Sequence, residues 1–355
     1  MNSAEYTLPA GFAAQLVAWQ ATAGRHGLPW QHTRDPYRVW LSEIMLQQTQ
    51  VSTVLDYYPR FLDRFPSVAS LAAAPLDDVL GLWSGLGYYS RARNLHRCAQ
   101  AVVAEHGGSF PADAVLLQTL PGIGRSTAAA IAAFCFDERV SILDGNVKRV
   151  LTRVLGFADD LAVAAHERQL WALAAELLPP HEAAHTMPRY TQALMDLGAT
   201  VCTARKPACT QCPVAALCRA KAEGRADAYP VKTRKLKRSS ASHWALWCQR
   251  ADGAVWLQQR PDTGIWAGLF CFPLFDSLAA LQQVLPGVPD SGLHSLSAFK
   301  HVLTHKDMHL HPVVCTLAAE TAPQTAGQWV AEQGWPALGL PAPVRKLLSG
   351  TVALR

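Results

Sequence analysis

The stretch "L120-P-G-I-G-R-S-T-A-A-A-I131" places a Pro-Gly-x-Gly turn directly before an alanine-rich segment. Alanine favours a helix after Ser126, and a short helix is expected near residues 114–118, so the turn joins two helices. Gly122 and Gly124 let the backbone pass close to a ligand, and the second helix offers free N–H groups to an anion. The sequence therefore predicts a helix–hairpin–helix that grips a phosphate backbone, with an ordinary helix–helix turn as the alternative.

A second glycine turn lies upstream, in "G81-L-W-S-G-L-G-Y-Y-S-R-A-R93". It combines two tyrosines, Tyr88 and Tyr89, which we expect to be exposed, with two arginines. Aromatic side chains can insert between bases while cations hold the adjacent phosphates. The stretch indicates a second contact with nucleic acid, unless the tyrosines pack in the core.

The sequence around these turns has helical periodicity in alanine-rich segments that proline and glycine separate. We expect an all-α domain of many short helices over residues 1–225. The chain has 355 residues, enough for two domains, and 50% of them are hydrophobic. Its net charge of +5 is compatible with nucleic acid but is not diagnostic of it.

No apolar run approaches the length of a membrane span, and the first residues lack the pattern of a secretory signal. We therefore expect a cytoplasmic protein, where disulfides are rare. We also expect it to be a monomer that does not bind a membrane.

Four of the nine cysteines fall in one window, "C202-T-A-R-K-P-A-C-T-Q-C-P-V-A-A-L-C218". Four close thiolates in a reducing compartment indicate a metal centre. The unequal spacing, C-x6-C-x2-C-x5-C, and the Cys-Pro step favour a [4Fe-4S] cluster, with zinc as the alternative. Arg205 and Lys206 lie between the first two ligands, where a cluster would present them to phosphate. The ligands would be Cys202, Cys209, Cys212 and Cys218.

The composition changes after the last of these cysteines. Residues 226–241 contain a proline, a basic cluster and little apolar content, so we expect a linker, which either faces solvent or contacts phosphate. Beyond it, short segments predict strands, and "D276-S-L-A-A-L-Q-Q-V-L" predicts a helix with Asp276 as its N-cap. Residues 242–355 are expected to form a separate α+β domain.

Two carboxylates stand in settings that suggest chemistry. Glu43, in "W40-L-S-E-I-M-L-Q-Q-T-Q50", lies in an apolar run on a helix that Asp35 is expected to cap. Asp144, in "I142-L-D-G-N-V-K-R-V150", precedes another helix. Two carboxyl groups in different environments meet the requirement for cleaving a glycosidic bond through an oxocarbenium-like state. The alternative is structural, with Glu43 on a helix rim and Asp144 as a helix cap.

With these motifs the sequence resembles the adenine DNA glycosylase (MutY) family of the endonuclease III superfamily. The matching stretches are "LPWQ" at 28–31, "VWLSEIMLQQTQV" at 39–51, "GLGYYSRARNL" at 85–95, "LPGIGRSTAAAI" at 120–131, "ILDGNVKRVL" at 142–151 and the four cysteines. The resemblance covers nearly the whole chain. It implies a helical catalytic region with a cluster loop, a Nudix-like C-terminal domain, and an enzyme that removes adenine mispaired with 8-oxoguanine or guanine from double-stranded DNA.

The resemblance also implies roles for single residues. Glu43 matches the glutamate that acts on the flipped adenine at N7, and Asp144 matches the aspartate beside the anomeric carbon. Asn146 is expected to contact the sugar or the catalytic water. The residues that match the adenine pocket are Leu28, Trp30, Gln31, Leu46 and Gln192. The residues expected to contact DNA are Gln48, Tyr88, Gly122, Gly124, Arg125, Ser126 and Lys148.

Strand-cutting members of the superfamily carry a lysine in the glycine turn, which forms a Schiff base with the sugar. Ser126 stands at that place here, so we expect a monofunctional glycosylase. In the C-terminal domain the resemblance implies a lesion-reading loop at Thr304 and His305, with Leu303 in place of the usual aromatic. The helix after Asp276 lacks the acids with which Nudix hydrolases hold Mg²⁺, so we do not expect nucleotide hydrolysis.

Two other functions are compatible with parts of the sequence. One is a strand-cutting glycosylase for oxidised pyrimidines, which Ser126 and the extra domain disfavour. The other is a DNA-binding scaffold with a structural cluster, in which Glu43 and Asp144 only pack and cap. Excision of adenine opposite 8-oxoguanine would separate all three.

Overall fold

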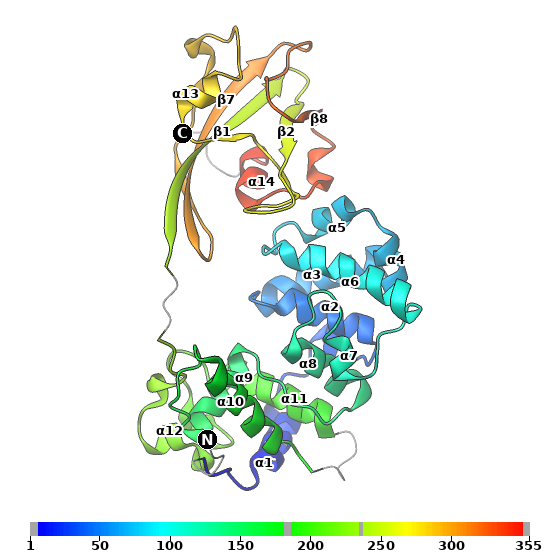
Figure 1. Cartoon of the computed structure of the whole chain (residues 1–355), viewed down its shortest axis with the longest axis vertical. Coiled ribbons are helices and arrows are strands. Elements are labelled where there is room, and N and C mark those ends of the chain that lie inside the picture. The colour runs from blue at the N-terminus through cyan, green and yellow to red at the C-terminus, as the bar shows by residue number, and fades with distance from the viewer. Residues whose placement is uncertain (1–5, 181–185, 234–236, 351–355) are drawn as a thin grey trace. The chain divides into compact units, whose positions relative to one another are not determined.

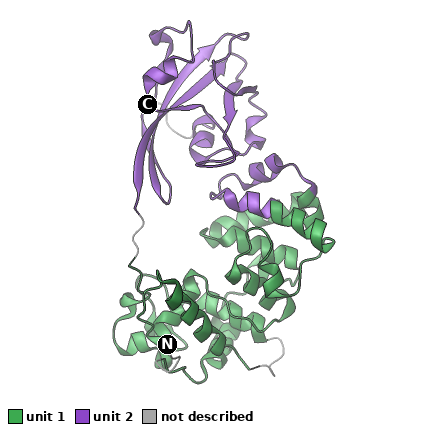
Figure 2. Cartoon of the chain, in the orientation of Figure 1, with its two compact units in different colours: residues 1–72, 97–235 green, residues 73–96, 236–355 purple. Residues whose placement is uncertain are grey.

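The structure is a computed structural model that describes residues 6–180, 186–233 and 237–350. The chain divides into two compact units, which Figure 2 distinguishes by colour. Unit 1 comprises residues 1–72 and 97–235, and unit 2 comprises residues 73–96 and 236–355. The division does not follow chain order, because residues 73–96 come from the middle of the helical sequence and group with the C-terminal residues.

Unit 1 is helical, as the periodicity of its sequence predicts (Figure 1). Its α-helices are α1 (Phe12–Ala23), α2 (Pro36–Leu46), α3 (Val51–Arg64), α4 (Val68–Ala73), α7 (Ala114–Leu117), α8 (Arg125–Phe136), α9 (Gly145–Leu155), α10 (Ala164–Glu176), α11 (Thr186–Asp196) and α12 (Arg219–Ala222). Its short turns are the 3-10 helices η2 (Pro29–Gln31), η4 (Cys209–Gln211), η5 (Ala215–Leu217) and η6 (Ala226–Ala228) and the π-helix η3 (Leu197–Val201). Helix α6 (Ser90–His106) begins among residues of unit 2 and ends among those of unit 1.

Helix α8 occupies the centre of the packing in unit 1. It contacts α2, α7 and α11, and residues 128–133, five alanines and an isoleucine, are all buried. Small side chains let the neighbouring helices come close. A core that includes Phe12, Leu170 and Tyr190 packs around the same region. The start of α8 is therefore held near α2 and α11, the helices that carry Glu43 and Gln192.

The ends of two helices follow the sequence closely. Asp35 caps α2 by accepting a hydrogen bond from the Tyr37 N–H, and Pro36 is the first helical residue. Asp144 caps α9 by accepting a hydrogen bond from the Val147 N–H at 2.7 Å. Both predicted caps are confirmed, because each satisfies an N–H that has no partner inside the helix.

Within residues 237–350, unit 2 contains a mixed eight-stranded sheet, which confirms the α+β expectation. Its strands are β1 (Ser239–Arg250), β2 (Val255–Gln259), β3 (Phe270–Cys271), β4 (Leu274–Phe275), β5 (His294–Ser295), β6 (Phe299–Val302), β7 (Lys306–Leu317) and β8 (Gln328–Val330). The order is β3-β2-β1-β7-β5, with β4 on β1, β6 on β7 and β8 on β2. The long strands β1 and β7 run parallel, and β1 begins inside the segment predicted as a linker. The helices of unit 2, including α5 from residues 73–96, are α5 (Leu76–Trp83), α13 (Leu278–Gln282), α14 (Ala342–Leu348), η7 (Asp290–Gly292) and η8 (Trp335–Ala337).

The predicted N-cap at Asp276 is wrong. Ser277 caps α13 instead, and its hydroxyl accepts a hydrogen bond from the Ala280 N–H at 3.1 Å. The carboxylate of Asp276 lies 3.5 Å from a ring nitrogen of His243. Both residue types are good caps, and Ser277 is the cap because the helix begins at Leu278.

Residues 73–96 pack closely against the C-terminal residues of unit 2. A Cβ atom on Gly81 would lie 2.1 Å from the carbonyl oxygen of Ala337, so only glycine fits at this contact. Tyr89 donates a hydrogen bond to the Leu340 carbonyl at 2.7 Å. Its side chain is only partly exposed, so the expectation of an exposed Tyr89 is wrong, whereas Tyr88 is 45% exposed.

Along the described residues, no helix combines the length and the apolar character that crossing a membrane requires.

Candidate active site

A pocket of about 1360 Å³ lies in unit 1, between α2, the start of α8, the start of α9 and α11. Its volume exceeds that of ordinary small-ligand sites, which suits a nucleotide that enters together with part of its strand. Segments far apart in the sequence meet there. The proposed site residues that line it are Leu28, Trp30, Gln31, Glu43, Leu46, Gln48, Ser126, Asp144, Asn146 and Gln192.

Glu43 enters this pocket from α2, and its neighbours in the helix, Ser42 and Ile44, are buried. Its own side chain is partly buried. Burial, followed by the negative charge of Asp144, raises the pKa of Glu43 to about 8. Burial disfavours the ionised form, so the carboxyl holds a proton at neutral pH and can donate it.

Asp144 faces the pocket from the N-terminus of α9. One of its oxygens accepts the capping hydrogen bond from Val147, so the carboxylate is held in place. Asn146 lies in the first turn of the same helix, and its side-chain oxygen Oδ1 accepts a hydrogen bond from Nη2 of Arg149 at 2.8 Å. Asp144 therefore caps the helix, as the structural alternative predicted, and it also lines the pocket.

The glycine turn has the geometry of a backbone ligand for an anion. Gly122 has a φ of 77°, in the left-handed region that glycine favours. Gly124 precedes α8 with open space where a Cβ would be, so an approaching phosphate can reach the free N–H groups. Arg125 is exposed, and its guanidinium lies 3.9 Å from the centre of the Trp171 ring.

Two further residues of this region make contacts that sequence reasoning did not anticipate. The hydroxyl of Ser126 accepts a hydrogen bond from the Leu143 N–H at 3.1 Å, which ties the turn to the segment before Asp144. The ammonium of Lys148 forms an ion pair with Glu167. Lys148 is not among the residues that line the pocket.

Gln48 and Tyr88, two of the residues expected to contact DNA, share an uncommon backbone conformation. Their φ angles are 56° and 48°, in the left-handed region that non-glycine residues rarely adopt. Such residues gather at functional sites, where the fold holds them in spite of the cost. In unit 2, Arg91 is almost fully buried, with its guanidinium over the rings of Trp83 and Tyr88.

The hydroxyls of Tyr88 and Thr304 lie 3.0 Å apart, within hydrogen-bond distance. Both residues belong to unit 2, and both are exposed. The carbonyl of Thr304 also accepts a hydrogen bond from Arg238 at 3.2 Å. His305, the other proposed lesion reader, is exposed beside them. The structure thus joins one proposed DNA contact to the proposed lesion-reading loop.

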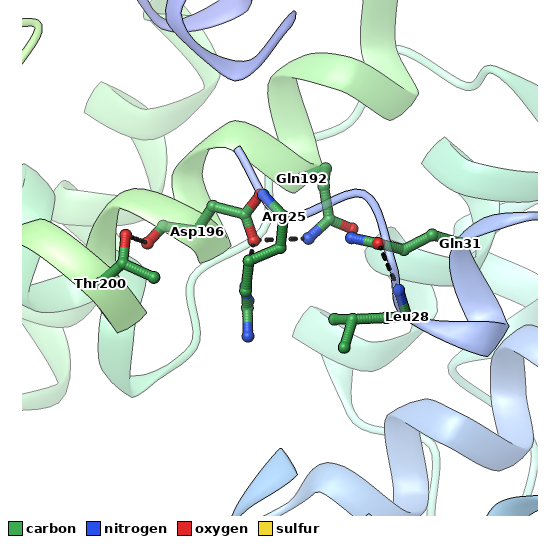
Figure 3. A network of polar contacts seen from close by, with 6 residues as sticks. All are labelled: Arg25, Leu28, Gln31, Gln192, Asp196 and Thr200. Atoms are coloured by element: carbon green, nitrogen blue, oxygen red, sulfur yellow. Dashed lines mark hydrogen bonds and ion pairs between the residues drawn. The ribbon is translucent and has the colours of Figure 1, made fainter. Parts of the chain in front are cut away.

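One wall of the pocket carries a polar network, shown in Figure 3. Gln192 donates from Nε2 to the Asp196 carboxylate at 2.8 Å, and Arg25 donates to the same carboxylate at 2.7 Å. The side-chain oxygen Oε1 of Gln31 accepts a hydrogen bond from the Leu28 N–H at 3.1 Å. Sequence reasoning missed Arg25 and Asp196. Their positions in the sequence could have indicated them. Arg25 lies just before "LPWQ", and Asp196 is one helical turn after Gln192.

The four cysteines of the window line one small pocket together with apolar side chains from α9 and η3. Among the described residues, no three His, Cys, Asp or Glu side chains are placed to hold a single metal ion. Because all four cysteines line the same pocket, they are placed together as the ligands of one cluster would be. Arg153 donates a hydrogen bond to the Cys202 sulfur at 3.4 Å. Arg205 and Lys206 are exposed in the loop.

Comparisons with protein families agree with this organisation. Residues 41–176 match the model described as HhH-GPD superfamily base excision DNA repair protein. Residues 202–218 match the iron–sulfur binding domain of endonuclease III, which supports an iron–sulfur cluster rather than zinc. Residues 244–350 match the NUDIX domain, as the resemblance implied.

Among solved structures, a thermostable thymine-DNA glycosylase superposes with a TM-score of 0.53 at 28% identity, covering 60% of this chain and 95% of that one. An endonuclease III–DNA complex superposes with a TM-score of 0.50 at 22% identity, covering 60% of this chain and 94% of that one, and supports the fold alone.

Curated relatives match along nearly the whole chain. An adenine DNA glycosylase of Buchnera aphidicola (subsp. Schizaphis graminum) is 36% identical over 343 residues, which cover 95% of this chain and 97% of the relative. The adenine DNA glycosylase of Mus musculus is 37% identical, covering 88% of this chain and 71% of the relative. With Glu43, the capped Asp144 and the cluster loop in one helical unit, and with adenine DNA glycosylases at 36% and 37% identity covering 95% and 88% of its length, this chain belongs to the adenine DNA glycosylase family.

Proposed function

We propose that the chain hydrolyses the N-glycosidic bond of adenine that is mispaired with 8-oxoguanine or guanine in double-stranded DNA. The observation that carries this proposal is the pair of carboxyl groups in the pocket. Glu43 has a pKa raised to about 8, and the charge of Asp144 is one cause of that shift. Two acids that face one pocket in different environments suit a reaction in which a base departs from a sugar cation.

In this mechanism Glu43 gives its proton to the departing adenine, because it remains protonated at neutral pH. Asp144, fixed by its capping hydrogen bond, stabilises the positive charge that develops on the sugar. Asn146 contacts the sugar or the attacking water. The adenine enters between Leu28, Trp30, Gln31, Leu46 and Gln192, which line the pocket.

We further propose that the turn at Gly122 and Gly124 and the loop with Arg205 and Lys206 hold the DNA backbone. Gln48 and Tyr88 fill the stack that the flipped adenine leaves. The four thiols would hold the [4Fe-4S] cluster, which stiffens the loop between Cys202 and Cys209. Its thiolates require a reducing compartment, which supports a cytoplasmic location.

In this proposal residues 1–225 form the glycosylase domain, residues 226–241 the linker, and residues 242–355 the domain that reads the opposite base. Thr304 and His305 offer a hydroxyl and an imidazole as hydrogen-bond partners for 8-oxoguanine. The contact between Tyr88 and Thr304 supports a shared role at the opposite strand.

Single-turnover excision with Glu43→Gln tests the function. The variant keeps the shape of the side chain but cannot supply the proton, so it should bind lesion duplex and lose at least about 10²-fold in excision rate. Glu138→Gln is the matched control: burial also raises the pKa of Glu138, and this side chain instead accepts a hydrogen bond from the Ala114 N–H. Near-normal excision by Glu43→Gln would refute the assigned role.

A further inference from the structure

We propose that Asp196, paired with Arg25, is a positioning residue that sets the hydrogen-bonding polarity of the base pocket and so its choice of adenine over 6-oxopurines. This inference rests on the proposed adenine excision and assigns a role to two residues outside the candidate catalytic set. Figure 3 shows the network that carries it.

Asp196 is a charged residue with no exposed side-chain surface at the C-terminal end of α11. Its carboxylate accepts three hydrogen bonds: from the Arg25 N–H at 2.9 Å, from Nε of Arg25 at 2.7 Å and from Nε2 of Gln192 at 2.8 Å. A buried carboxylate is tolerated only when it is paired and hydrogen-bonded. Arg25 supplies the opposite charge, so the arrangement is complete only with both residues.

The carboxylate determines which way the Gln192 amide points. An ionised carboxylate accepts hydrogen bonds and cannot donate them, so Gln192 must turn its NH₂ group toward Asp196. Its carbonyl oxygen is then the end that remains for a ligand. In Figure 3 this end of Gln192 points toward Gln31, on the opposite side of the network.

Gln31 is held in the complementary orientation. Its carbonyl accepts the Leu28 N–H at 3.1 Å, which leaves Nε2 as its free end. That nitrogen is buried and has no hydrogen-bond partner among the described residues. An unpaired buried donor is costly, so it points to a ligand that supplies an acceptor. The wall thus offers one donor, from Gln31, and one acceptor, from Gln192.

This pattern complements one edge of adenine. On its Watson–Crick edge, by which flipped bases are read, adenine carries the N6 amino group, which donates, beside N1, which accepts. Guanine and hypoxanthine carry a carbonyl oxygen and a ring N–H at the corresponding places, so both contacts would become repulsive. Reversing the Gln192 amide would remove the discrimination, and the hydrogen bond to the Asp196 carboxylate opposes that reversal.

The first test is Asp196→Asn, which preserves size but leaves one acceptor oxygen for three donors. Oδ1 receives both Nε of Arg25 and Nε2 of Gln192, so an NH₂ group in its place releases the Gln192 amide from its single orientation. Single-turnover excision of adenine opposite 8-oxoguanine should fall by about tenfold or more, the cost of an unpaired polar group in a buried site. The ratio of adenine to hypoxanthine excision, measured on matched duplexes, should fall as well. Thr200→Ala is the control, because Thr200 donates to the Asp196 backbone carbonyl and not to its carboxylate.

The second test is rescue. The carboxylate introduced by Gln192→Glu presents an acceptor to the base in either orientation. This substitution should therefore restore adenine excision and the adenine-to-hypoxanthine ratio when it is added to Asp196→Asn. Alone, Gln192→Glu places two carboxylates side by side and should lower the excision rate. The two substitutions should therefore compensate each other, with a double-variant rate above that of either single variant.

Thermal unfolding and cluster absorbance report folding separately from the base preference. If Asp196→Asn retains the wild-type adenine-to-hypoxanthine ratio, or if Gln192→Glu lowers its adenine excision further, the inference is wrong. If Asp196→Asn does not fold, Gln192→Leu replaces it: this variant removes the acceptor and must lower the same ratio. Failure of the wild type to excise adenine would instead overturn the proposed function, so the two failures are distinguishable.

Discussion

At the scale of single residues, Glu43 illustrates how position changes chemistry. The side chain is an ordinary glutamate on a helix whose other residues are mostly buried. Burial and the nearby Asp144 raise its pKa to about 8, so the group is a proton donor at a pH where an exposed glutamate is a charged acceptor. Asp144, held by a backbone N–H, complements it as the charged partner.

The raised pKa predicts the pH dependence of excision. The rate constant for adenine removal should be nearly constant on the acid side of about pH 8 and should fall as pH rises above it, because Glu43 then loses its proton. Single-turnover rates on lesion duplex between pH 6 and about pH 10 measure this. A rate that rises through this range would show that Glu43 acts as a base.

The same shift predicts a stability effect, with a definite sign. The unfolded chain releases the Glu43 proton near the ordinary value of 4.5 and the folded chain near 8, so folding stability falls as pH rises between them. Each unit costs about 1.4 kcal/mol, which amounts to a penalty on the order of 3 kcal/mol at pH 7. Glu43→Gln should therefore unfold at a higher temperature than wild type at pH 7, and the gain should vanish near pH 4.5.

The control for that measurement is Glu105→Gln, which changes an exposed acid on α6. It should leave the unfolding temperature almost unchanged at both pH values. If Glu43→Gln and Glu105→Gln change the unfolding temperature equally, the pKa of Glu43 is not raised by folding.

At the scale of elements, the glycine turn decides which chemistry follows base removal. Ser126 carries a hydroxyl and no amine, and the ammonium of Lys148 is paired with Glu167, so no free amine from these two residues faces the sugar. Product strands should keep intact abasic sites until alkali is added, and borohydride should trap little covalent complex. Strong trapping that Lys148→Ala abolishes would instead establish a lyase step through that lysine.

The cluster loop is a second element with a measurable role. The purified protein should be brown and contain about four irons, as a [4Fe-4S] centre requires. Cys212→Ser should lower the iron content and weaken DNA binding, because the loop with Arg205 and Lys206 loses its anchor. Cys135→Ser is the control, since Cys135 lies on α8 outside the cluster window. A colourless wild type with stoichiometric zinc would contradict the assignment.

At the scale of the whole molecule, the C-terminal residues do more than extend the chain. Ser84 donates to the Leu340 carbonyl at 3.0 Å, and Arg93 donates to the Ala267 carbonyl at 2.6 Å. Unit 2 is thus assembled from two separate stretches of sequence. A chain truncated after Arg225 leaves residues 73–96 without these contacts.

Truncation should therefore have two effects. Adenine excision should persist, because Glu43, Asp144 and the four cysteines remain, while the preference for 8-oxoguanine over guanine opposite adenine should fall with the loss of Thr304. The unfolding temperature should also fall, because apolar side chains around Gly81 become exposed. Thr304→Ala in the full chain is the comparison: loss of one hydrogen bond, roughly 0.5–1.5 kcal/mol, should lower the preference only several-fold. Equal discrimination by the truncated and full chains would place lesion reading elsewhere.

Several features of this protein follow from the sequence alone because they depend on neighbours in the chain. Apolar periodicity set the helices, Asp35 and Asp144 identified helix starts, and the spacing of four cysteines indicated the cluster. The same motifs carried the resemblance to the glycosylase family. Where two good caps stood side by side, at Asp276 and Ser277, local pattern could not choose between them.

Other features were decided only by the tertiary structure. The pKa of Glu43 depends on desolvation by residues from other segments and on the charge of Asp144. Arg25 and Asp196 pair across 171 residues, and Tyr88 meets Thr304 across 216. Residues 73–96, helical by their local pattern, group with a sheet domain that begins far along the chain. Periodicity and capping record which face of a segment is buried, but burial depth, charge pairing and amide orientation depend on which distant segment covers that face.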